Sequence, residues 1–345
     1  MKHTRLLSGS NAQDLQAAAA ILRAGGLVAM PTETVYGLAA DALNGAAVAG
    51  IFAAKGRPQD NPLIVHISSM EEWRPLVKAI PDQALMLAAA YWPGPLTMIL
   101  PRDNCIPDEV SAGLDTVAVR MPSHPVAREL IRLTGRPLAA PSANRSGIPS
   151  PTTAAHVRQD MDGRIDAIVD GGMCTVGVES TVVDLSGGTP RLLRPGGITV
   201  AMMEEVVGQV QVDEAVTHAL RDGAVAASPG MKYKHYAPSA RVVLVRGTPE
   251  AYAAFIRRQA AQHPQGLVAM CFDGEETGLP VESVTYGARD DAAAQAHRVF
   301  DALRKLDELH AKIAYAACPS PEGVGLAVYN RLLRAAAFEV IDVDG

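Results

Sequence analysis

Residues 27–42 read LVAMPTETVYGLAADA, and this stretch sets the pattern for the first part of the chain. Leu27–Met30 is a short apolar run that predicts a buried strand, and Pro31 breaks it. The polar loop PTETVYG follows at once, and we expect the chain to continue from this loop into a helix. Before the strand, Asp14–Ala24 has helical spacing and ends at two glycines. A buried strand between a helix and a polar loop is typical of a sheet with flanking helices.

The same signals recur along the chain to about residue 210. Helices are predicted over Ala46–Ala54, Pro81–Tyr91 and Pro125–Thr134. Strands are predicted over Leu63–Ile67, Leu96–Leu100, Val117–Arg120, Pro137–Ala140, Ile168–Asp170, Ser180–Leu185 and Arg191–Arg194. Helices and strands are mixed rather than strictly alternating, so we predict an α/β domain built on a twisted mixed sheet.

A second rhythm begins at Arg241. The runs RVVLV, GLVAMCF and KIAYAAC predict strands that alternate with helices over 250–261, 291–310 and 327–337. This βαβαβα order predicts a smaller parallel sheet of Rossmann-like character. No GxGxxG follows its first strand, so we expect no dinucleotide site there. We therefore divide the chain into a first domain (1–210), a linker rich in Pro, Gly, Lys and Tyr (211–240) and a C-terminal α/β domain (241–345).

The composition agrees with two globular domains. The chain has 345 residues, of which 48% are apolar and 20% charged, and its net charge is −6. This acidity argues against a general nucleic-acid coat protein but leaves room for a local basic site. The sequence has no CxxC, HExxH, Walker A or GxSxG motif, so we expect no metal site, no P-loop and no serine-hydrolase elbow. We expect no signal peptide and no membrane span, and therefore a cytoplasmic protein.

Polar loops follow several predicted strands of the first domain. The PTETVYG loop could form an N-cap and a turn, or the floor of a small-substrate pocket around Thr34. In KGRPQDNP, Lys55 and Arg57 could neutralise a helix C-terminus, or clamp phosphate together with Asn61. His66 lies in the next strand, and a lone histidine in a strand is more often a satisfied core residue than a catalytic one.

Two arginines end predicted strands of the same domain. Arg120 closes a strand of small apolar residues that begins near Thr116. A buried arginine needs an anionic partner, which could be a substrate carboxylate or an internal Asp or Glu. Arg194 stands at the end of RLLR, before Pro-Gly-Gly.

Hydroxyl groups gather in two further loops, around Ser142 to Ser150 (SANRSGIPS) and at Ser180 (GVEST). Such loops can present hydroxyls and backbone N–H groups to phosphate, or be merely solvated. Each signal is weak alone. Together, four cationic side chains among hydroxyl-rich loops of one domain predict an anionic ligand.

The motifs PTETVYGL, KGRPQDNPL, SANRSG and STVVDL…LLRPG together resemble the YrdC-like threonylcarbamoyl-AMP synthases. The resemblance covers about residues 12–210, and SPGMKYKHYAP with the domain after it resembles the longer, two-domain members. It implies the reaction of L-threonine, bicarbonate and ATP to threonylcarbamoyl-AMP, pyrophosphate and water. It also implies Mg²⁺ on the nucleotide, and a downstream tRNA threonylcarbamoyl transferase complex that modifies adenosine next to the anticodon.

The resemblance also implies roles for single residues. Threonine would be bound by Thr34, His66, Arg120, the Ala140 backbone and Ser180. ATP or the adenylate would be held by Arg57, Asn61, Thr116, Ser142, Ser150, Arg194 and Tyr236. Lys55 and Arg57 would act as catalytic cations facing the phosphates. Tyr236, with Lys232 and Lys234 in the linker, would close over the nucleotide as a lid.

The implied chemistry agrees with this set of residues, because such a reaction chiefly needs positioning and charge neutralisation. One alternative is an RNA-binding module that docks double-stranded RNA or tRNA without ATP turnover. Another is a carbamoyl-adenylate-forming domain of the kind found in hydrogenase maturation, but the zinc-binding cysteine pairs of those proteins are absent here. Direct contact with tRNA is left open.

Overall fold

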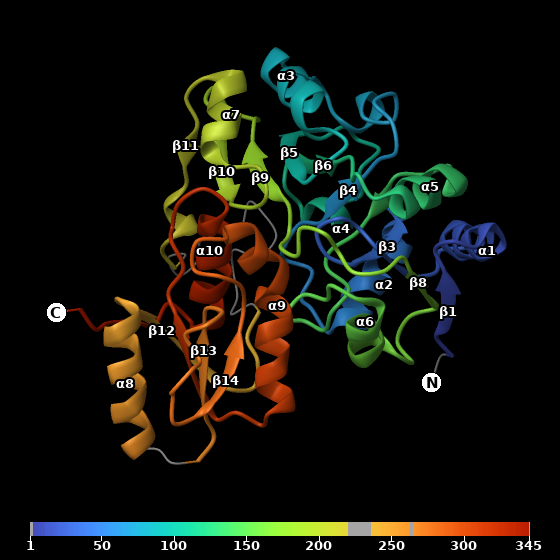
Figure 1. Cartoon of the computed structure of the whole chain (residues 1–345). Coiled ribbons are helices and arrows are strands. Elements are labelled where there is room, and N and C mark those ends of the chain that lie inside the picture. Colours follow the sequence, from blue (N-terminus) through green and yellow to red (C-terminus); the bar gives the residue numbers. More distant parts are fainter. Residues whose placement is uncertain (1–2, 220–235, 263–264, 345) are drawn as a thin grey trace. The chain divides into compact units, whose positions relative to one another are not determined.

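The structure is a computed structural model that describes residues 3–219, 236–262 and 265–344. This part of the chain folds into two compact units (Figure 1). The first contains the described residues up to Val216 except Gly147–Pro149. The second contains Gly147–Pro149, Thr217–Ala219 and the described residues from 236 onward. Most of the proposed linker, including Lys232 and Lys234, lies outside the described residues.

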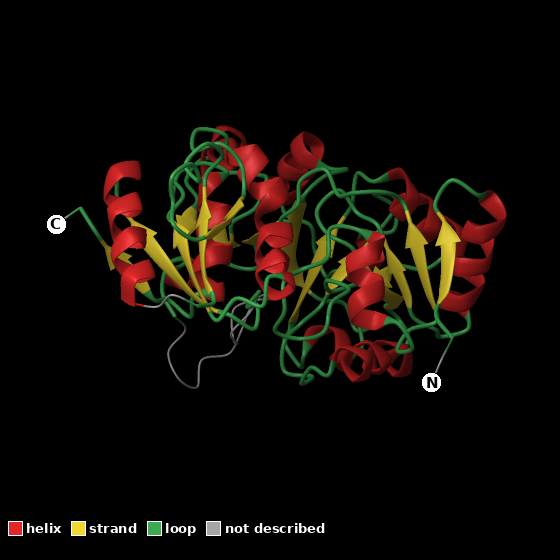
Figure 2. Ribbon diagram, turned by 60° about the horizontal axis from the view of Figure 1, so that its bottom comes forward, coloured by secondary structure: helices red, strands yellow, loops and turns green. Residues whose placement is uncertain are grey.

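The first unit is built on one mixed sheet, as predicted (Figure 2). Its eleven described strands have the order β1-β8-β2-β3-β7-β4-β6-β5-β9-β10-β11. They are β1 (Arg5–Ser8), β2 (Val28–Met30), β3 (Gly37–Asp41), β4 (Ile64–His66), β5 (Leu96–Pro101), β6 (Thr116–Arg120), β7 (Leu138–Ala139), β8 (Ala167–Asp170), β9 (Thr181–Asp184), β10 (Arg191–Arg194) and β11 (Gln211–Val212). The helices are α1 (Ala12–Arg23), α2 (Gly45–Lys55), α3 (Asp82–Tyr91), α4 (Asp108–Ser111), α5 (Pro125–Thr134), α6 (Ala154–Met161) and α7 (Val200–Val207).

Helix ends follow the local sequence. Asn11 caps α1 by accepting hydrogen bonds from the N–H groups of Gln13 and Asp14. Gly56 ends α2 in the left-handed region at φ 63°, which glycine adopts without strain. The expected passage from loop to helix after Tyr36 is wrong, because Gly37–Asp41 forms β3 and pairs with β2 and β7.

The two faces of the central strands differ. On one face, Val65, Val117 and Met98 join the main hydrophobic core. On the other face, a small cluster consists of Ile64, Ile99, Ala118, Val182, Leu193 and Ala215. Because side chains alternate along a strand, polar residues two positions away from this small cluster share its face.

The second unit has an all-parallel sheet, which confirms the prediction for the C-terminal region. Its elements are β12 (Arg241–Arg246), α8 (Pro249–Gln262), β13 (Leu267–Cys271), β14 (Glu282–Thr285), α9 (Ala292–Glu308), β15 (Ile313–Ala317), α10 (Gly325–Ala335) and β16 (Val340–Asp342). The strand order is β14-β13-β15-β12-β16, so β15 is inserted between β12 and β13. Helices α9 and α10 pack together, and α8 lies on the other side of the strands (Figures 1 and 2).

Candidate active site

A polar row crosses the central strands of the first unit. His66 on β4 stands beside Arg120 on β6, and Arg120 stands beside Thr97 on β5. Residues in register on neighbouring strands project to the same side of a sheet. These three side chains therefore share the face of the small apolar cluster, and all three are buried. The row forms the floor of the candidate site.

Arg120 is the central charge of this row. Its Nη2 atom lies 2.7 Å from Glu33 Oε1, Nη1 donates to Thr34 Oγ1 at 2.9 Å, and Nε donates to the Gly94 carbonyl at 3.3 Å. Burial raises the pKa of Glu33, but the charge and hydrogen bond of Arg120, helped by backbone N–H groups, outweigh burial and lower it. Of the two partners that the sequence left open for Arg120, the structure shows the internal carboxylate.

Side-chain hydrogen bonds fix the loop after β2. The Thr32 hydroxyl donates to the Val35 carbonyl at 2.6 Å and lies 2.8 Å from the Thr34 hydroxyl. Because a hydroxyl has one proton, Thr34 must donate to Thr32 while it accepts from Arg120. This chain fixes the Thr34 hydroxyl beside the guanidinium.

A second hydroxyl pair flanks the row. Thr97 Oγ1 and Ser180 Oγ are 2.8 Å apart. Arg194 donates two hydrogen bonds to Ser180, from Nε to its carbonyl at 3.0 Å and from Nη2 to its hydroxyl at 3.1 Å. The end of β10 therefore positions the loop that leads into β9.

His66 is neutral in this setting. Burial is the largest cause of its lowered pKa, the charge of Arg120 lowers it further, and the pKa falls to about 3. Its Nδ1 lies 3.2 Å from the Ile64 carbonyl, which can only accept. The Leu138 backbone also hydrogen-bonds the ring, and a neutral imidazole has one N–H donor and one acceptor nitrogen.

Lys55 ends α2 and is buried. Its ammonium donates to the carbonyls of Ser142 at 2.5 Å and Asn144 at 2.7 Å. Burial lowers the pKa of Lys55 well below its usual range, Arg57 lowers it further, and Asp160 and Glu179 oppose this. In this position Lys55 shapes the Ser142–Asn144 loop, and its expected contact with phosphate stays a prediction.

Arg57, Asn61 and Ser150 lie near this loop region, whereas Thr116 does not. Arg57 donates to the Asn61 carbonyl at 3.2 Å, and its guanidinium lies 5.8 Å from the centre of the Phe52 ring. Ser150 donates to Glu179 Oε1 at 2.5 Å. Thr116 shares the face of Arg120 at the opposite end of β6, about 13 Å away at the usual strand rise.

Backbone hydrogen bonds join the polar loops. Tyr36 donates to the Pro151 carbonyl at 2.9 Å, and Ala143 donates to the Tyr36 carbonyl at 2.8 Å. Gly177 donates to the Thr34 carbonyl at 3.2 Å. Ala140 donates to the Ile64 carbonyl at 2.9 Å, beside the polar row. Loops that are far apart in the sequence therefore meet on one side of the sheet.

The structure brings most of the expected residues of the first domain into this region, namely Thr34, Lys55, Arg57, Asn61, His66, Arg120, Ala140, Ser142, Ser150, Ser180 and Arg194. Tyr236 belongs to the second unit. Glu33, Thr97 and Glu179 also belong to this region and were not predicted as single site residues from the sequence. A threonine at an alternating position in the apolar run LTMIL was the available signal for Thr97.

Among the described residues, no group of three or more His, Cys, Asp or Glu side chains could hold a metal ion. In the same part of the chain, no helix is long and apolar enough to cross a membrane.

Comparison with known proteins defines the class. A family model described as telomere recombination (Sua5, YciO and YrdC) matches residues 20–196. A second one, described as the C-terminal domain of threonylcarbamoyl-AMP synthase, matches residues 198–337. The chain belongs to the Sua5/YrdC family of threonylcarbamoyl-AMP synthases, in its two-domain form, as the motifs indicated.

Full-length relatives carry the same name. Threonylcarbamoyl-AMP synthase of Pyrococcus abyssi is 46% identical over 335 residues, which cover 95% of this chain and 96% of the relative. That of Bacillus subtilis is 46% identical, with 96% and 95% covered. The crystal structure of P. abyssi Sua5 complexed with L-threonine has a TM-score of 0.90 and 43% identity, and the match covers 99% of each chain.

Proposed function

We propose that this chain synthesises threonylcarbamoyl-AMP from L-threonine, bicarbonate and ATP. The observation that carries the proposal is the 46% identity with P. abyssi threonylcarbamoyl-AMP synthase across both domains. The polar row supports it, since a buried arginine among hydroxyls suits a small amino acid with a carboxylate. The RNA-binding alternative has no comparable support.

The reaction assigns tasks to groups on one side of the sheet. The threonine amine attacks the bicarbonate carbon and a C–O bond breaks with loss of water, which gives a carbamate. The carboxylate of this carbamate attacks the α-phosphorus of ATP and expels pyrophosphate. We propose that threonine is held by Thr34, His66, Arg120, Ala140 and Ser180. ATP would be held by Arg57, Asn61, Thr116, Ser142, Ser150, Arg194 and Tyr236.

His66 would act as a hydrogen-bond acceptor rather than as a general base. A side chain with a pKa of about 3 is too weak a base to take a proton from an ammonium group at neutral pH. The acceptor nitrogen of the neutral ring would instead orient the amine or hydroxyl of threonine. Arg57 and Arg194 would stabilise the charge that develops on the phosphates.

Mg²⁺ would enter with ATP, where it neutralises phosphate charge. The donor set fits this arrangement, because Glu33 is paired with Arg120 and Glu179 accepts from Ser150. Neither carboxylate belongs to an acidic cluster in the described chain. We propose that phosphate oxygens, rather than side chains, hold the ion.

The product would pass to a tRNA threonylcarbamoyl transferase complex in the cytoplasm. We also propose that residues 211–240 form a lid over the nucleotide, and that Lys55 and Arg57 form a clamp on its phosphates. Closure would protect the labile mixed anhydride from water.

The test is the substrate requirement. We expect pyrophosphate release only when threonine, bicarbonate and ATP are present together, and mass spectrometry should detect the adenylate. Release at the same rate without threonine would contradict the proposal. RNA binding with a steep salt dependence and no ATP turnover would favour the alternative.

A further inference from the structure

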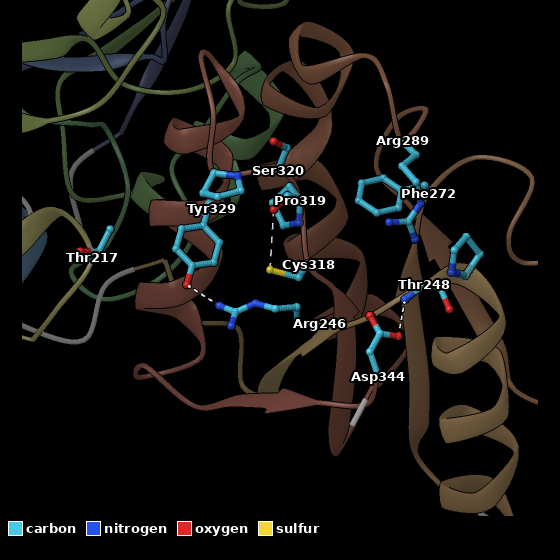
Figure 3. A pocket seen from close by; sticks show the side chains of 13 residues that line it. Thr217, Arg246, Thr248, Phe272, Arg289, Cys318, Pro319, Ser320, Tyr329 and Asp344 are labelled. Atoms are coloured by element: carbon cyan, nitrogen blue, oxygen red, sulfur yellow. Dashed lines mark hydrogen bonds between the residues drawn. The ribbon is translucent and has the colours of Figure 1, made fainter.

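A pocket of about 670 Å³ opens in the second unit at the carboxyl ends of its parallel strands. Arg246 and Thr248 line it from the end of β12, and Cys318 and Ser320 from the loop after β15. Arg289, from the loop between β14 and α9, lines it from another side (Figure 3). The volume is within the usual range for small-molecule sites.

The order of the strands identifies this edge of the sheet as a candidate ligand site. From β12 the chain crosses through α8 to β13, whereas from β15 it crosses the opposite way through α10 to β16. Right-handed crossovers in opposite directions place their helices on opposite faces of the sheet. The adjacent strands β12 and β15 therefore form a topological switch point. Open α/β sheets bind ligands at such points, outside the carboxyl ends of the strands.

Flat groups line two opposite sides of the pocket. The guanidinium of Arg289 lies 4.5 Å from the centre of the buried Phe272 ring and is held by two hydrogen bonds to Glu275. Tyr329 on α10 stands across the pocket from this pair (Figure 3). A fixed guanidinium plane and a tyrosine ring are surfaces on which a nucleobase stacks.

Charged groups line the rest. Arg246 is about half exposed and makes long contacts, 3.8 Å to Asp342 Oδ2 and 3.5 Å to the Tyr329 hydroxyl. Five N–H donors on a guanidinium leave further donors for a phosphate. Asp344 accepts from the Thr248 N–H at 2.8 Å and lines the pocket, where its carboxylate can meet a ribose hydroxyl. The mixture of charges suits a ligand with one anionic group rather than a polyphosphate.

We propose that this pocket binds a mononucleotide, with its phosphate at Arg246 and its base beside Arg289 and Tyr329. None of the residues that line this pocket is among those proposed to bind threonine or ATP, and the pocket needs no GxGxxG because it takes no dinucleotide.

The experiment is calorimetric titration of the full chain with AMP. Arg246→Ala removes the phosphate contact, and Ser320→Trp places a large side chain in the pocket from an exposed position. Each variant should bind one AMP fewer per chain than the wild type, or bind it roughly 10- to 100-fold more weakly at that site. Synthesis of threonylcarbamoyl-AMP should be unchanged, so failure here is distinct from failure of the proposed function.

Arg241→Ala is the matched control. Arg241 begins the strand that Arg246 ends, and it likewise pairs with a carboxylate, Glu339. This variant should bind AMP like the wild type. Equal stoichiometry and affinity in the wild type, Arg246→Ala and Ser320→Trp would overturn the proposal, as would inorganic phosphate binding there as tightly as AMP.

Discussion

Arg120 and Glu33 form a buried ion pair in which each charge depends on the other. Their side chains are 4% and 7% exposed, so neither is hydrated well enough to be stable alone. The pair also sets the Thr34 hydroxyl, which accepts from the same guanidinium. Arg120 therefore both holds the loop after β2 and presents a cation at the site.

Arg120→Met tests this double role. The change leaves Glu33 as a buried charge without its cation, so we expect a loss of about 3–5 kcal/mol in the free energy of unfolding. Threonine binding should fall as well, because the cation and the fixed Thr34 hydroxyl are both lost. Chemical denaturation and threonine titration measure the two effects.

The double variant Arg120→Met/Glu33→Gln separates stability from binding. Replacing the carboxylate by a neutral amide removes the uncompensated charge, so part of the stability should return. Threonine binding should not return with it. If the double variant binds threonine like the wild type, Arg120 has a purely structural role.

His66 gives a prediction about pH. The pKa of His66 is about 3 in the folded protein, below the usual value near 6.5. Between pH 6.5 and 3, therefore, His66 is protonated in the unfolded chain but neutral in the folded one. Stability from neutral His66 is therefore complete above about pH 6.5 and is lost as the pH falls toward 3. His66→Asn should show a flatter decline of stability than the wild type across this window.

The NMR signals of the His66 ring provide a direct measurement. They should remain those of a neutral imidazole down to about pH 4. An inflection of these signals near pH 6 would show that the ring is hydrated and would remove the argument against a general base.

At the scale of elements, a glycine allows the chain after β10 to approach the backbone at the start of β9 closely. The antiparallel pairing of β9 and β10 has an irregularity between Leu192 and Arg194, and Gly196 lies two positions after Arg194. A Cβ on Gly196 would lie 2.3 Å from the Thr181 nitrogen and 2.7 Å from the Glu179 carbonyl oxygen. These are backbone atoms that cannot rotate away.

Gly196→Ala should therefore push β10 from the start of β9. We expect a loss of about 1–3 kcal/mol in the free energy of unfolding, as for overpacked cores. Adenylate synthesis should also be slower, because Arg194 would lose its hydrogen bonds to Ser180. Thermal unfolding and pyrophosphate release measure the two.

Gly187→Ala is the control for this prediction. Gly187 lies in the exposed β9–β10 connection, and a Cβ there would meet no atom within 4 Å. If both alanine variants have the same stability, the close approach at Gly196 does not constrain the pair of strands.

Some elements could not be predicted because their own residues do not specify them. Gly37–Asp41 is rich in glycine and alanine, which are poor strand formers, and only pairing with β2 and β7 makes it a strand. In contrast, α6 and α7 begin at Thr153 and Thr199, whose side chains cap them. These N-cap threonines were signals in the sequence that could have located both helices.

At the scale of the whole molecule, the sequence indicated the chemistry of the site but not its internal pairing. Strand-end arginines and hydroxyl-rich loops predicted an anionic ligand, and their motifs predicted the family. That Arg120 pairs with Glu33, and that Lys55 binds the Ser142 and Asn144 carbonyls, depends on contacts across more than 80 positions. Such contacts follow from the tertiary arrangement of helices, strands and loops rather than from local pattern.

Tyr236 has two candidate roles, one as part of the proposed lid over ATP and one as a packing residue of the second unit. In that unit the Tyr236 ring lies 5.2 Å from Phe300 and beneath the guanidinium of Arg331, and the residue is 5% exposed. Both roles predict that Tyr236→Ala is destabilising, by about 3–5 kcal/mol for a truncated buried aromatic. Only the lid predicts that the KM for ATP rises as well.

Phe255 provides the matched control, since it is equally buried in the same unit and packs edge-on to Tyr315 at 4.9 Å. We expect Phe255→Ala to lose similar stability at an unchanged KM for ATP. Equal KM values for both variants below their unfolding temperatures would refute the lid and leave Tyr236 as a packing residue.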